Sequence, residues 1–327
     1  MRVITKPEHS GIEWQSIRHR DPEGNVVFGA SESASLLNRS EYESQGDLIT
    51  RKLLPPATSE SSPAMDTGNL FEPTLIAEAS RRLGIEIVTP DLMFGQGRFV
   101  ATPDGIDAYS YKRILSHEAT KKTPDIWVEA KCTSRYQVAS VKDIPEAWSW
   151  QMAAQRYVTK ADSIYLIVLD SRLHINLIEV PPNPEAEQVL IDTANKIGDM
   201  IDSGSIREQM VDQLSADQIA RLWVAEDKTI ELPANAVELI ESFVEAKAKQ
   251  NEWQAIESEA KDAIARMMLD AQVGTIDGQQ IITWKEQAGR SGFDAKQFAI
   301  DNPTLFAKYQ KTGDPFRVMR VSKKKGK

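Results

Sequence analysis

Two acidic residues and a lysine have the types and spacing that suit phosphodiester chemistry. Asp104 stands in a Pro-Asp-Gly turn, and Glu129 and Lys131 follow in the apolar stretch 126–132. Because side chains alternate along a strand, Glu129 and Lys131 share one face if this stretch is extended. Two carboxylates can hold a hard divalent cation, and an ammonium beside them can stabilise charge on a phosphate. The pattern predicts metal-dependent phosphodiester hydrolysis, with DNA as the substrate.

The expected metal is Mg²⁺, with Mn²⁺ as a substitute. Asp104 and Glu129 would supply carboxylates, and the backbone carbonyl of Ala130 would be a third protein ligand, since Mg²⁺ keeps several waters and needs few carboxylates. Lys131 would orient or deprotonate the attacking water, or stabilise the transition state. The sequence leaves these roles open, as it does the choice between one ion and two.

Three further polar residues are candidates for the same site. Glu72 lies near the start of a helix expected over 68–83 and is a further candidate ligand. Gln151 and Gln155 lie four residues apart on a helix expected over 145–159, so they share a face. A glutamine there could hold the attacking water or a phosphate oxygen, and we assign Gln155 to DNA contact. Each residue alone has an ordinary reading as a surface or turn residue, but the order and spacing together favour a site.

Helices and strands alternate around these residues, which predicts an α/β core with a mixed central sheet flanked by helices. Proline-rich breaks at 181–184 and 232–233 then divide the chain. We expect a nuclease core over 1–182, a helical continuation over 183–233, and a third region over 234–327 with a long helix and a small α+β domain. Strands are expected over 85–88, 99–102, 126–131, 163–169 and 173–180, helices over 12–20, from Ser31 onward, 236–271 and 294–300, and a hairpin turn at Asp277-Gly278.

Composition narrows the class of protein. Cys132 is the only cysteine among 327 residues, which excludes an internal disulfide and a four-cysteine iron–sulfur cluster and favours a reducing cytoplasm. No apolar run approaches the roughly 18 residues of a membrane span, so no membrane partner is expected. The net charge of −9 is uneven, because residues 183–262 hold 18 acids and 7 bases. The remainder is therefore slightly basic, and the lysine-rich tail 323–327 is a candidate weak phosphate binder.

The chain resembles the lambda-exonuclease / YqaJ-like viral recombinase family of the PD-(D/E)xK nuclease superfamily. The resemblance covers roughly the first 180 residues and implies a restriction-endonuclease-like core. It rests on the segments 14–18, 29–32, 68–72, 102–105 and 129–134, and on the helix that carries Gln151 and ends at 157–159.

The resemblance implies roles for individual residues. Glu72, Asp104 and Glu129 would bind the metals, Lys131 would be the catalytic lysine, and Gln151 would support it. Arg18, Ser31 and Thr102 match positions that hold a terminal 5′-phosphate. A guanidinium can donate two hydrogen bonds to a phosphate, and the N-terminus of the helix expected to begin at Ser31 would attract the phosphate. Arg20 is an alternative to Arg18 in this role.

The implied activity is 5′→3′ digestion of double-stranded DNA from its ends, which leaves 3′ single strands for phage-type recombination. The resemblance also implies a ring-shaped homotrimer, a single-strand annealing protein as partner, and a phage or prophage protein acting in the cytoplasm of a bacterial host. Two alternatives remain open. One is a structure-specific or nicking endonuclease with the same metal site, and the other is a nuclease-fold module that binds DNA or protein without cleaving.

Overall fold

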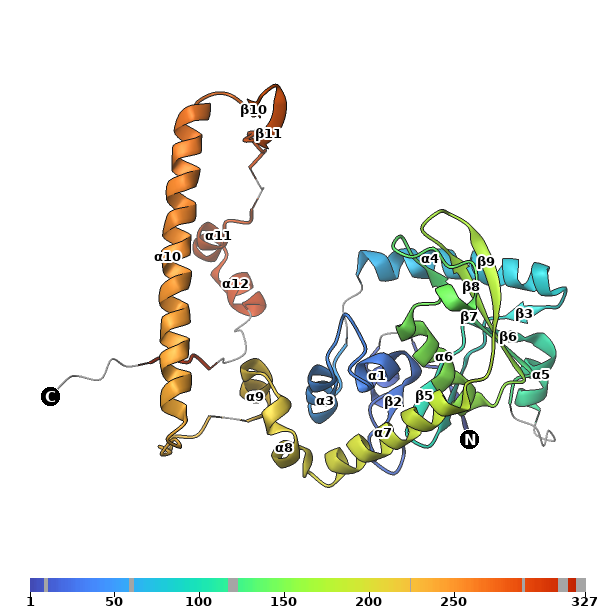
Figure 1. Ribbon diagram of the computed structural model, residues 1–327. Helices are drawn as coiled ribbons and strands as arrows, with labels where there is room; N and C mark the ends of the chain where they lie inside the picture. Colours follow the sequence, from blue (N-terminus) through green and yellow to red (C-terminus); the bar gives the residue numbers. More distant parts are fainter. Residues whose placement is uncertain are drawn as a thin grey trace. The chain divides into compact units, whose positions relative to one another are not determined.

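The computed structural model describes residues 1–8, 11–58, 62–116, 123–223, 225–289, 292–310 and 317–321 (Figure 1). The basic tail 323–327 lies outside these residues. The chain divides into two compact units, Met1–Val224 and Ala225–Lys327. None of the helices in the described ranges is long and apolar enough to cross a membrane.

A five-stranded mixed sheet forms the centre of the first unit, in the order β3-β6-β7-β8-β9. β7 is the middle strand, antiparallel to β6 and parallel to β8. Its two neighbours pair with its backbone along both edges, and helices cover both faces of the sheet, which agrees with the apolar content of the stretch. The strands are β3 (Ile87–Val88), β6 (Gly105–Asp107), β7 (Ile126–Cys132), β8 (Ser163–Leu169) and β9 (Ile175–Val180).

Helices cover both faces of this sheet, so the predicted α/β architecture is confirmed (Figure 1). On one face, α4 (Pro63–Leu83) packs Leu75, Ile76 and Ala79 in one apolar cluster with Val128 of β7. On the other face, α6 (Glu146–Thr159) belongs to the larger core that contains Trp127, the neighbour of Val128. Alternation along β7 therefore assigns odd-numbered residues, including Glu129 and Lys131, to the α6 side.

A second sheet of four strands, in the order β1-β4-β5-β2, shares the larger core. β2 runs parallel to β5, with Phe28 opposite Phe99 and Gly29 opposite Val100. The first strand pairs with β4 across almost ninety residues of chain and was not predicted. The strands are β1 (Arg2–Thr5), β2 (Phe28–Gly29), β4 (Leu92–Gln96) and β5 (Phe99–Ala101).

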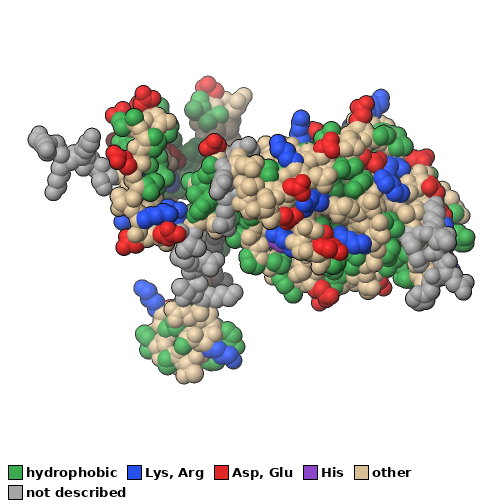
Figure 2. All heavy atoms as spheres, turned by 90° about the horizontal axis from the view of Figure 1, so that it is seen from below, with side chains coloured by type: hydrophobic (Ala, Val, Ile, Leu, Met, Phe, Trp, Pro, Cys, Tyr) green, Lys and Arg blue, Asp and Glu red, His purple; other side chains and the backbone are tan. Residues whose placement is uncertain are grey.

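The remaining helices of the first unit are short, apart from α7. They are α1 (Ile12–Ile17), η1 (Ala30–Glu32), α2 (Ser33–Leu36), α3 (Gln45–Leu53), α5 (Ala108–Leu115), η2 (Val141–Asp143), α7 (Pro184–Asp202), α8 (Ile206–Gln209), η3 (Val211–Gln213) and α9 (Ala216–Leu222). Positively and negatively charged side chains are interspersed on the face of this unit that Figure 2 shows.

The prediction that a helix begins at Ser31 is wrong. Residues 30–32 form one 3-10 turn whose first residue is capped by Gly29, and the α-helical part spans only four residues, Ser33–Leu36. The Glu32 carboxylate accepts the Gly29 N–H at 2.7 Å, which closes the turn from the other side. Ser31 therefore caps no helix, and a helix N-terminus is not what would attract a phosphate there. The first predicted helix also ends early, at Ile17, because Arg20 pairs with Val26 in a β-bridge.

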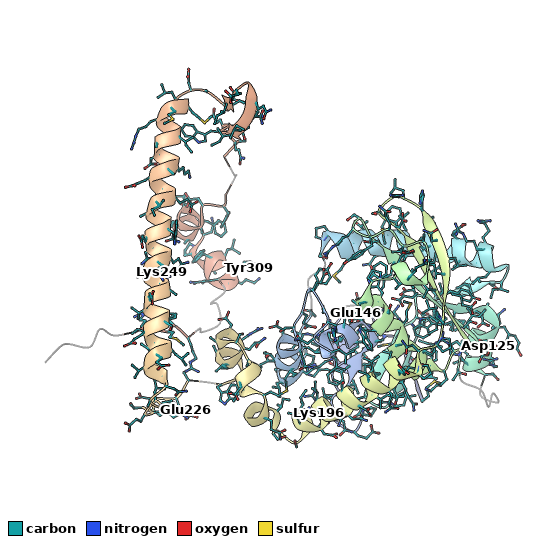
Figure 3. The ribbon with its side chains drawn as sticks, in the orientation of Figure 1. Asp125, Glu146, Lys196, Glu226, Lys249 and Tyr309 are labelled. Atoms are coloured by element: carbon teal, nitrogen blue, oxygen red, sulfur yellow. The ribbon has the colours of Figure 1, made fainter. Side chains whose placement is uncertain are left out.

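The second unit contains the long helix and the small α+β part that the sequence predicts. α10 spans Ala236–Met268, and its side chains, including Lys249, stand out from the helix (Figure 3). The hairpin of β10 (Val273–Ile276) and β11 (Gln279–Thr283) turns at Asp277 and Gly278, whose φ angles are 51° and 78°. Both angles are positive, as an Asp-Gly hairpin turn requires. Two helices, α11 (Ala295–Asp301) and α12 (Pro303–Tyr309), follow.

Candidate active site

The register of the central sheet brings Asp104 beside Glu129. Gly105 lies opposite Val128 in the antiparallel pair β6–β7, so the residue before Gly105 meets the residue after Val128. Asp104 Oδ2 accepts the backbone N–H of Ala130 at 2.8 Å. A Cβ on residue 105 would come within 2.6 Å of Ile87 Cγ2, so only glycine allows this close approach. The Asp-Gly pair thus supplies both the carboxylate and the fit that positions it.

Glu129 is 3% exposed and is held by three side-chain donors. Lys131 Nζ and Gln151 Nε2 both donate to Oε1 at 2.6 Å, and Gln155 Nε2 donates to Oε2 at 2.5 Å. The two glutamines lie one turn apart on α6, which faces this side of β7. Both oxygens of Glu129 are therefore fixed in position by charged or amide donors.

Gln155 does not fit the DNA contact assigned to it. Its side chain is 1% exposed and bonds the buried carboxylate of Glu129, so no surface remains for a phosphate. The i, i+4 spacing correctly places Gln155 on the face of Gln151, but spacing alone does not show how deeply a residue is buried. The geometry makes Gln155 a positioning residue for Glu129.

Glu72 approaches the same group from α4, next to Pro73, which lies inside the helix. Burial raises the pKa of Glu72, and Glu129 raises it further, against the opposing effect of Lys6 and Lys131. Burial together with the negative charges of Glu129 and Glu72 holds the pKa of Asp104 well above its usual range. Glu72, Asp104, Glu129 and Lys131, named here the acidic cluster, therefore place three mutually repelling carboxylates around one ammonium.

The acidic cluster fits a hard divalent cation by its chemistry. Its donors are carboxylate oxygens, and their repulsion is of the kind that a bound cation relieves. Within the described ranges, no three Asp, Glu, His or Cys side chains come close enough to hold one ion together. The predicted ligand set of Glu72, Asp104 and Glu129 is therefore not assembled as one three-carboxylate site. The observed contact of Ala130 with Asp104 is made by its backbone N–H and not by the carbonyl that was predicted as a ligand.

Arg18 and Ser31, predicted to hold a terminal phosphate, do lie together. Arg18 Nη2 donates to Ser31 Oγ at 2.7 Å, and the guanidinium carbon lies 4.2 Å from the centre of the Trp14 ring. Arg20, the alternative, donates through Nη1 and Nη2 to the carbonyls of His19 and Lys52, both at 2.9 Å. The guanidinium of Arg20 is thus used to hold backbone, and the geometry favours Arg18 as the group available to an anion.

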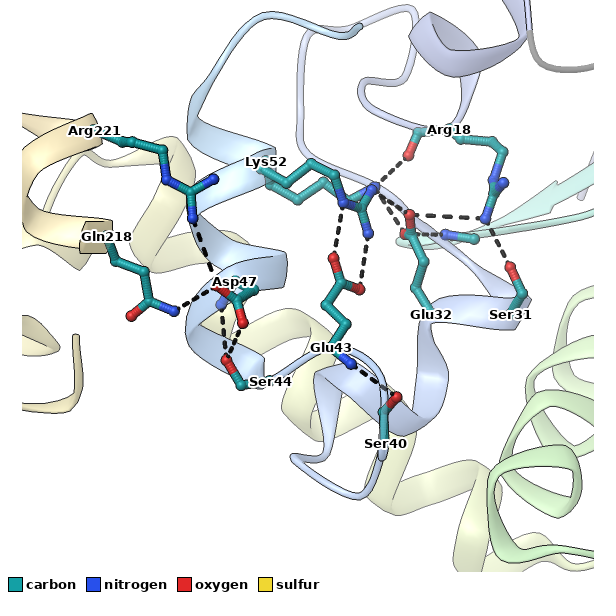
Figure 4. Close-up of polar contacts among 12 residues, drawn as sticks. Arg18, Ser31, Glu32, Ser40, Glu43, Ser44, Asp47, Lys52, Gln218 and Arg221 are labelled. Carbon is teal, nitrogen blue, oxygen red and sulfur yellow. Dashed lines mark hydrogen bonds and ion pairs between the residues drawn. The ribbon is translucent and has the colours of Figure 1, made fainter. Parts of the chain in front are cut away.

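The buried carboxylate at the centre of this region, Glu32, was not among the predicted site residues. Glu32 is 6% exposed and lies 2.8 Å from Arg51 Nη1, 2.8 Å from Lys52 Nζ and 3.7 Å from Arg18 Nη2 (Figure 4). Burial alone would raise the pKa of Glu32, but Lys52, Arg18 and Arg51 outweigh it and lower the pKa overall. We name Arg18, Glu32, Arg51 and Lys52 the basic cluster.

The two clusters lie at the same end of β5. Pairing of Gly29 with Val100 brings the turn that carries Ser31 to the end of that strand, where Thr102 follows. Thr102 is only two residues before Asp104, a backbone span of at most about 7 Å. The chain between Ala101 and Gly105 therefore links the basic cluster to the acidic one.

Part of the chain is similar to a known protein family. The profile of the YqaJ-like viral recombinase domain matches residues 13–162, a span that holds both clusters. No curated protein sequence matches the chain.

Among solved structures, an alkaline exonuclease from Laribacter hongkongensis is 15% identical, with 63% of this chain and 100% of that chain covered and a TM-score of 0.46. A phage-related exonuclease from Haemophilus somnus 129PT is 9% identical, with 57% and 97% covered and a TM-score of 0.40. Residues 13–162 of the 327-residue chain are therefore similar to the YqaJ-like viral recombinase domain.

Proposed function

We propose that this protein is a divalent-metal-dependent DNA exonuclease that digests double-stranded DNA 5′→3′ from its ends. The 3′ single strands that remain would enter phage-type recombination. One observation carries the proposal: an acidic cluster suited to a metal and a basic cluster suited to a phosphate lie at the same end of β5. An enzyme that cuts beside a terminal phosphate needs these two sites next to each other.

The residues of the acidic cluster have separate tasks. Asp104 and Glu129 would hold Mg²⁺ or Mn²⁺, which when bound activates water and offsets charge on the scissile phosphate. Gln151 and Gln155 keep Glu129 oriented through their bonds to its two oxygens. Lys131, whose pKa is lowered by burial but raised overall by Glu129 and Asp104, supplies a positive charge next to the reacting phosphate.

The basic cluster would receive the 5′-phosphate of the terminal nucleotide. Arg18 offers a guanidinium beside the Ser31 hydroxyl, and Arg51 lies on the same side of Glu32 with its side chain 43% exposed. Charge-assisted bonds of this kind hold phosphate in a fixed position. Thr102 would add a hydroxyl at the junction of the two clusters.

Partners follow from the family resemblance and from the charge distribution. A ring-shaped homotrimer would enclose the duplex, and a single-strand annealing protein would take up the product strand. Residues 183–262, with 18 acids and 7 bases, repel phosphate and suit a surface turned away from DNA.

The test is digestion of linear duplex DNA with and without 5′-phosphates, next to closed circular DNA, in Mg²⁺ and in EDTA. We expect loss of linear DNA only in Mg²⁺, faster with 5′-phosphates, and an intact circle. Cutting of the circle would identify an endonuclease, and no cleavage in Mg²⁺ or Mn²⁺ would leave a DNA-binding module.

A further inference from the structure

Glu32 is the centre of a network rather than one partner of an ion pair. Its Oε2 accepts from the Gly29 N–H at 2.7 Å and lies 2.8 Å from Lys52 Nζ. Its Oε1 accepts from Arg51 Nη1 at 2.8 Å and lies 3.7 Å from Arg18 Nη2. Among the described residues, this carboxylate contacts three positive charges and one backbone donor, and so joins the members of the basic cluster to the turn at Gly29.

Arg18 is confined on several sides at once. The Trp14 ring lies under its guanidinium, and the Ser31 hydroxyl accepts from Nη2. A Cβ on residue 29 would stand 2.3 Å from Arg18 Nη2, so the side chain lies directly against the backbone of Gly29. This placement depends on the turn that the Glu32 carboxylate closes through the Gly29 N–H.

Lys52 and Arg51 are ordered by the same carboxylate from α3. Lys52 is 1% exposed and also donates to the backbone carbonyl of Arg18 at 2.6 Å. Arg51 also pairs with a second carboxylate, since its Nε lies 2.9 Å from Glu43 Oε1. Three cations held this close would repel one another without Glu32, and the long side chains would move apart.

We infer that Glu32 is a positioning residue that sets the preference for 5′-phosphorylated ends by fixing Arg18 and Arg51 in place. This inference rests on the proposed binding of a terminal phosphate by the basic cluster. Glu32 itself would not touch the phosphate, because it is buried and negative. Its effect would pass through the two guanidinium groups and through Gly29, which lies between Glu32 and Arg18.

The experiment measures binding of a short duplex with and without a 5′-phosphate, in EDTA, so that neither metal nor hydrolysis is needed. The readout is the affinity ratio of the two duplexes, which does not depend on the fraction of folded protein. We expect Glu32→Gln to reduce the ratio about tenfold, or about 1.4 kcal/mol, because charged hydrogen bonds to the phosphate would be weakened. Glu32→Asp keeps the charge and should restore part of the ratio.

Glu78→Gln is the matched control. Glu78 also pairs with two arginines, Arg81 and Arg82, both at 2.7 Å, but it lies near the far end of α4 and outside both clusters. The affinity ratio of the Glu78→Gln variant should equal that of the wild type. If Glu32→Gln does not fold, an affinity ratio of Glu32→Asp below that of the wild type carries the test. Gly29→Ala tests the group on which Glu32 would act, because the added methyl displaces Arg18 and leaves the Glu32 carboxylate in place.

The outcomes separate the two claims. A wild-type ratio near one would overturn the phosphate role of the basic cluster, and the inference with it. A clear wild-type preference that Glu32→Gln retains would overturn the inference alone, whereas retention by Gly29→Ala would overturn the phosphate role of Arg18. A reduced ratio in these two variants, with Glu78→Gln unchanged, would support it.

Discussion

The acidic and basic clusters have opposite arrangements of charge. In the acidic cluster, the single ammonium of Lys131 lies among three carboxylates; in the basic cluster, the single carboxylate of Glu32 lies among three cations. Each cluster contains a buried carboxylate, Glu129 or Glu32, and the chain that follows β5 runs from the turn of the basic cluster to Asp104.

Their internal bonding differs, and this difference is informative. The central group of the basic cluster is satisfied, since Glu32 has close contacts to Arg51, Lys52 and the Gly29 N–H, and its pKa is lowered overall. Two members of the acidic cluster, Glu72 and Asp104, instead have raised pKa values. A buried charge without sufficient compensation costs stability. If the basic cluster binds a phosphate as proposed, it does so as a pre-formed site. The carboxylates of the acidic cluster repel one another, and the proposed metal would relieve that repulsion.

Removal of the central cation from the acidic cluster should have the largest effect. We expect Lys131→Ala to reduce the rate of DNA hydrolysis by about 10²–10³-fold, as loss of one preorganised group that stabilises the transition state does in other enzymes. DNA binding in EDTA should persist, because the basic cluster is intact. Single-turnover digestion in Mg²⁺ measures the rate. Lys196→Ala, on the exposed side of α7 (Figure 3), is the control and should match the wild type; equal rates for both variants would refute a role for Lys131.

Neutralisation of one carboxylate in each cluster should change stability in opposite directions. Glu32→Gln leaves the buried Lys52 without its carboxylate partner and should lower the free energy of unfolding by about 3 kcal/mol. Asp104→Asn keeps an acceptor for the Ala130 N–H and relieves repulsion, so it should raise that free energy by roughly 1 kcal/mol in EDTA. Urea unfolding of the two variants and the wild type measures both values. A loss of stability in both variants would contradict the view that the carboxylates of the acidic cluster repel one another.

Local rules predicted the parts of the molecule that depend on neighbouring residues. Alternation along β7 placed Glu129 and Lys131 on one face, and the structure shows Lys131 Nζ donating to Glu129. The Asp277-Gly278 turn and the left-handed Gly84 at the end of α4 follow from the backbone freedom of those residue types. These features need no knowledge of distant contacts.

Long-range contacts account for what was missed. The strand at Arg2–Thr5 is short and is defined only by its pairing with β4. Arg51 and Lys52 join Glu32 across about twenty residues, and a lysine and an arginine at a helix end usually face solvent. One signal was present: Lys52 follows Leu48 and Ile49 at the i+4 and i+3 positions, which places it on the buried face of α3.

His19 offers the smallest and most selective test of the basic cluster. Burial and the positive charges of Lys52 and Arg20 lower the pKa of this histidine to about 4. The unfolded chain takes up a proton below the ordinary value of about 6.5, whereas the folded protein does so only near 4. Stability should therefore fall as the pH drops from about 6.5 to about 4, since the proton favours the unfolded state.

Other groups titrate in the same range, so the informative quantity is the stability of the wild type minus that of His19→Gln at each pH. This difference should decline by roughly 1–2 kcal/mol between pH 6.5 and pH 4.5. Urea unfolding at four or five pH values would measure it. A constant difference would mean that protonated His19 is accommodated, and the basic cluster would then be less crowded with positive charge than its geometry indicates.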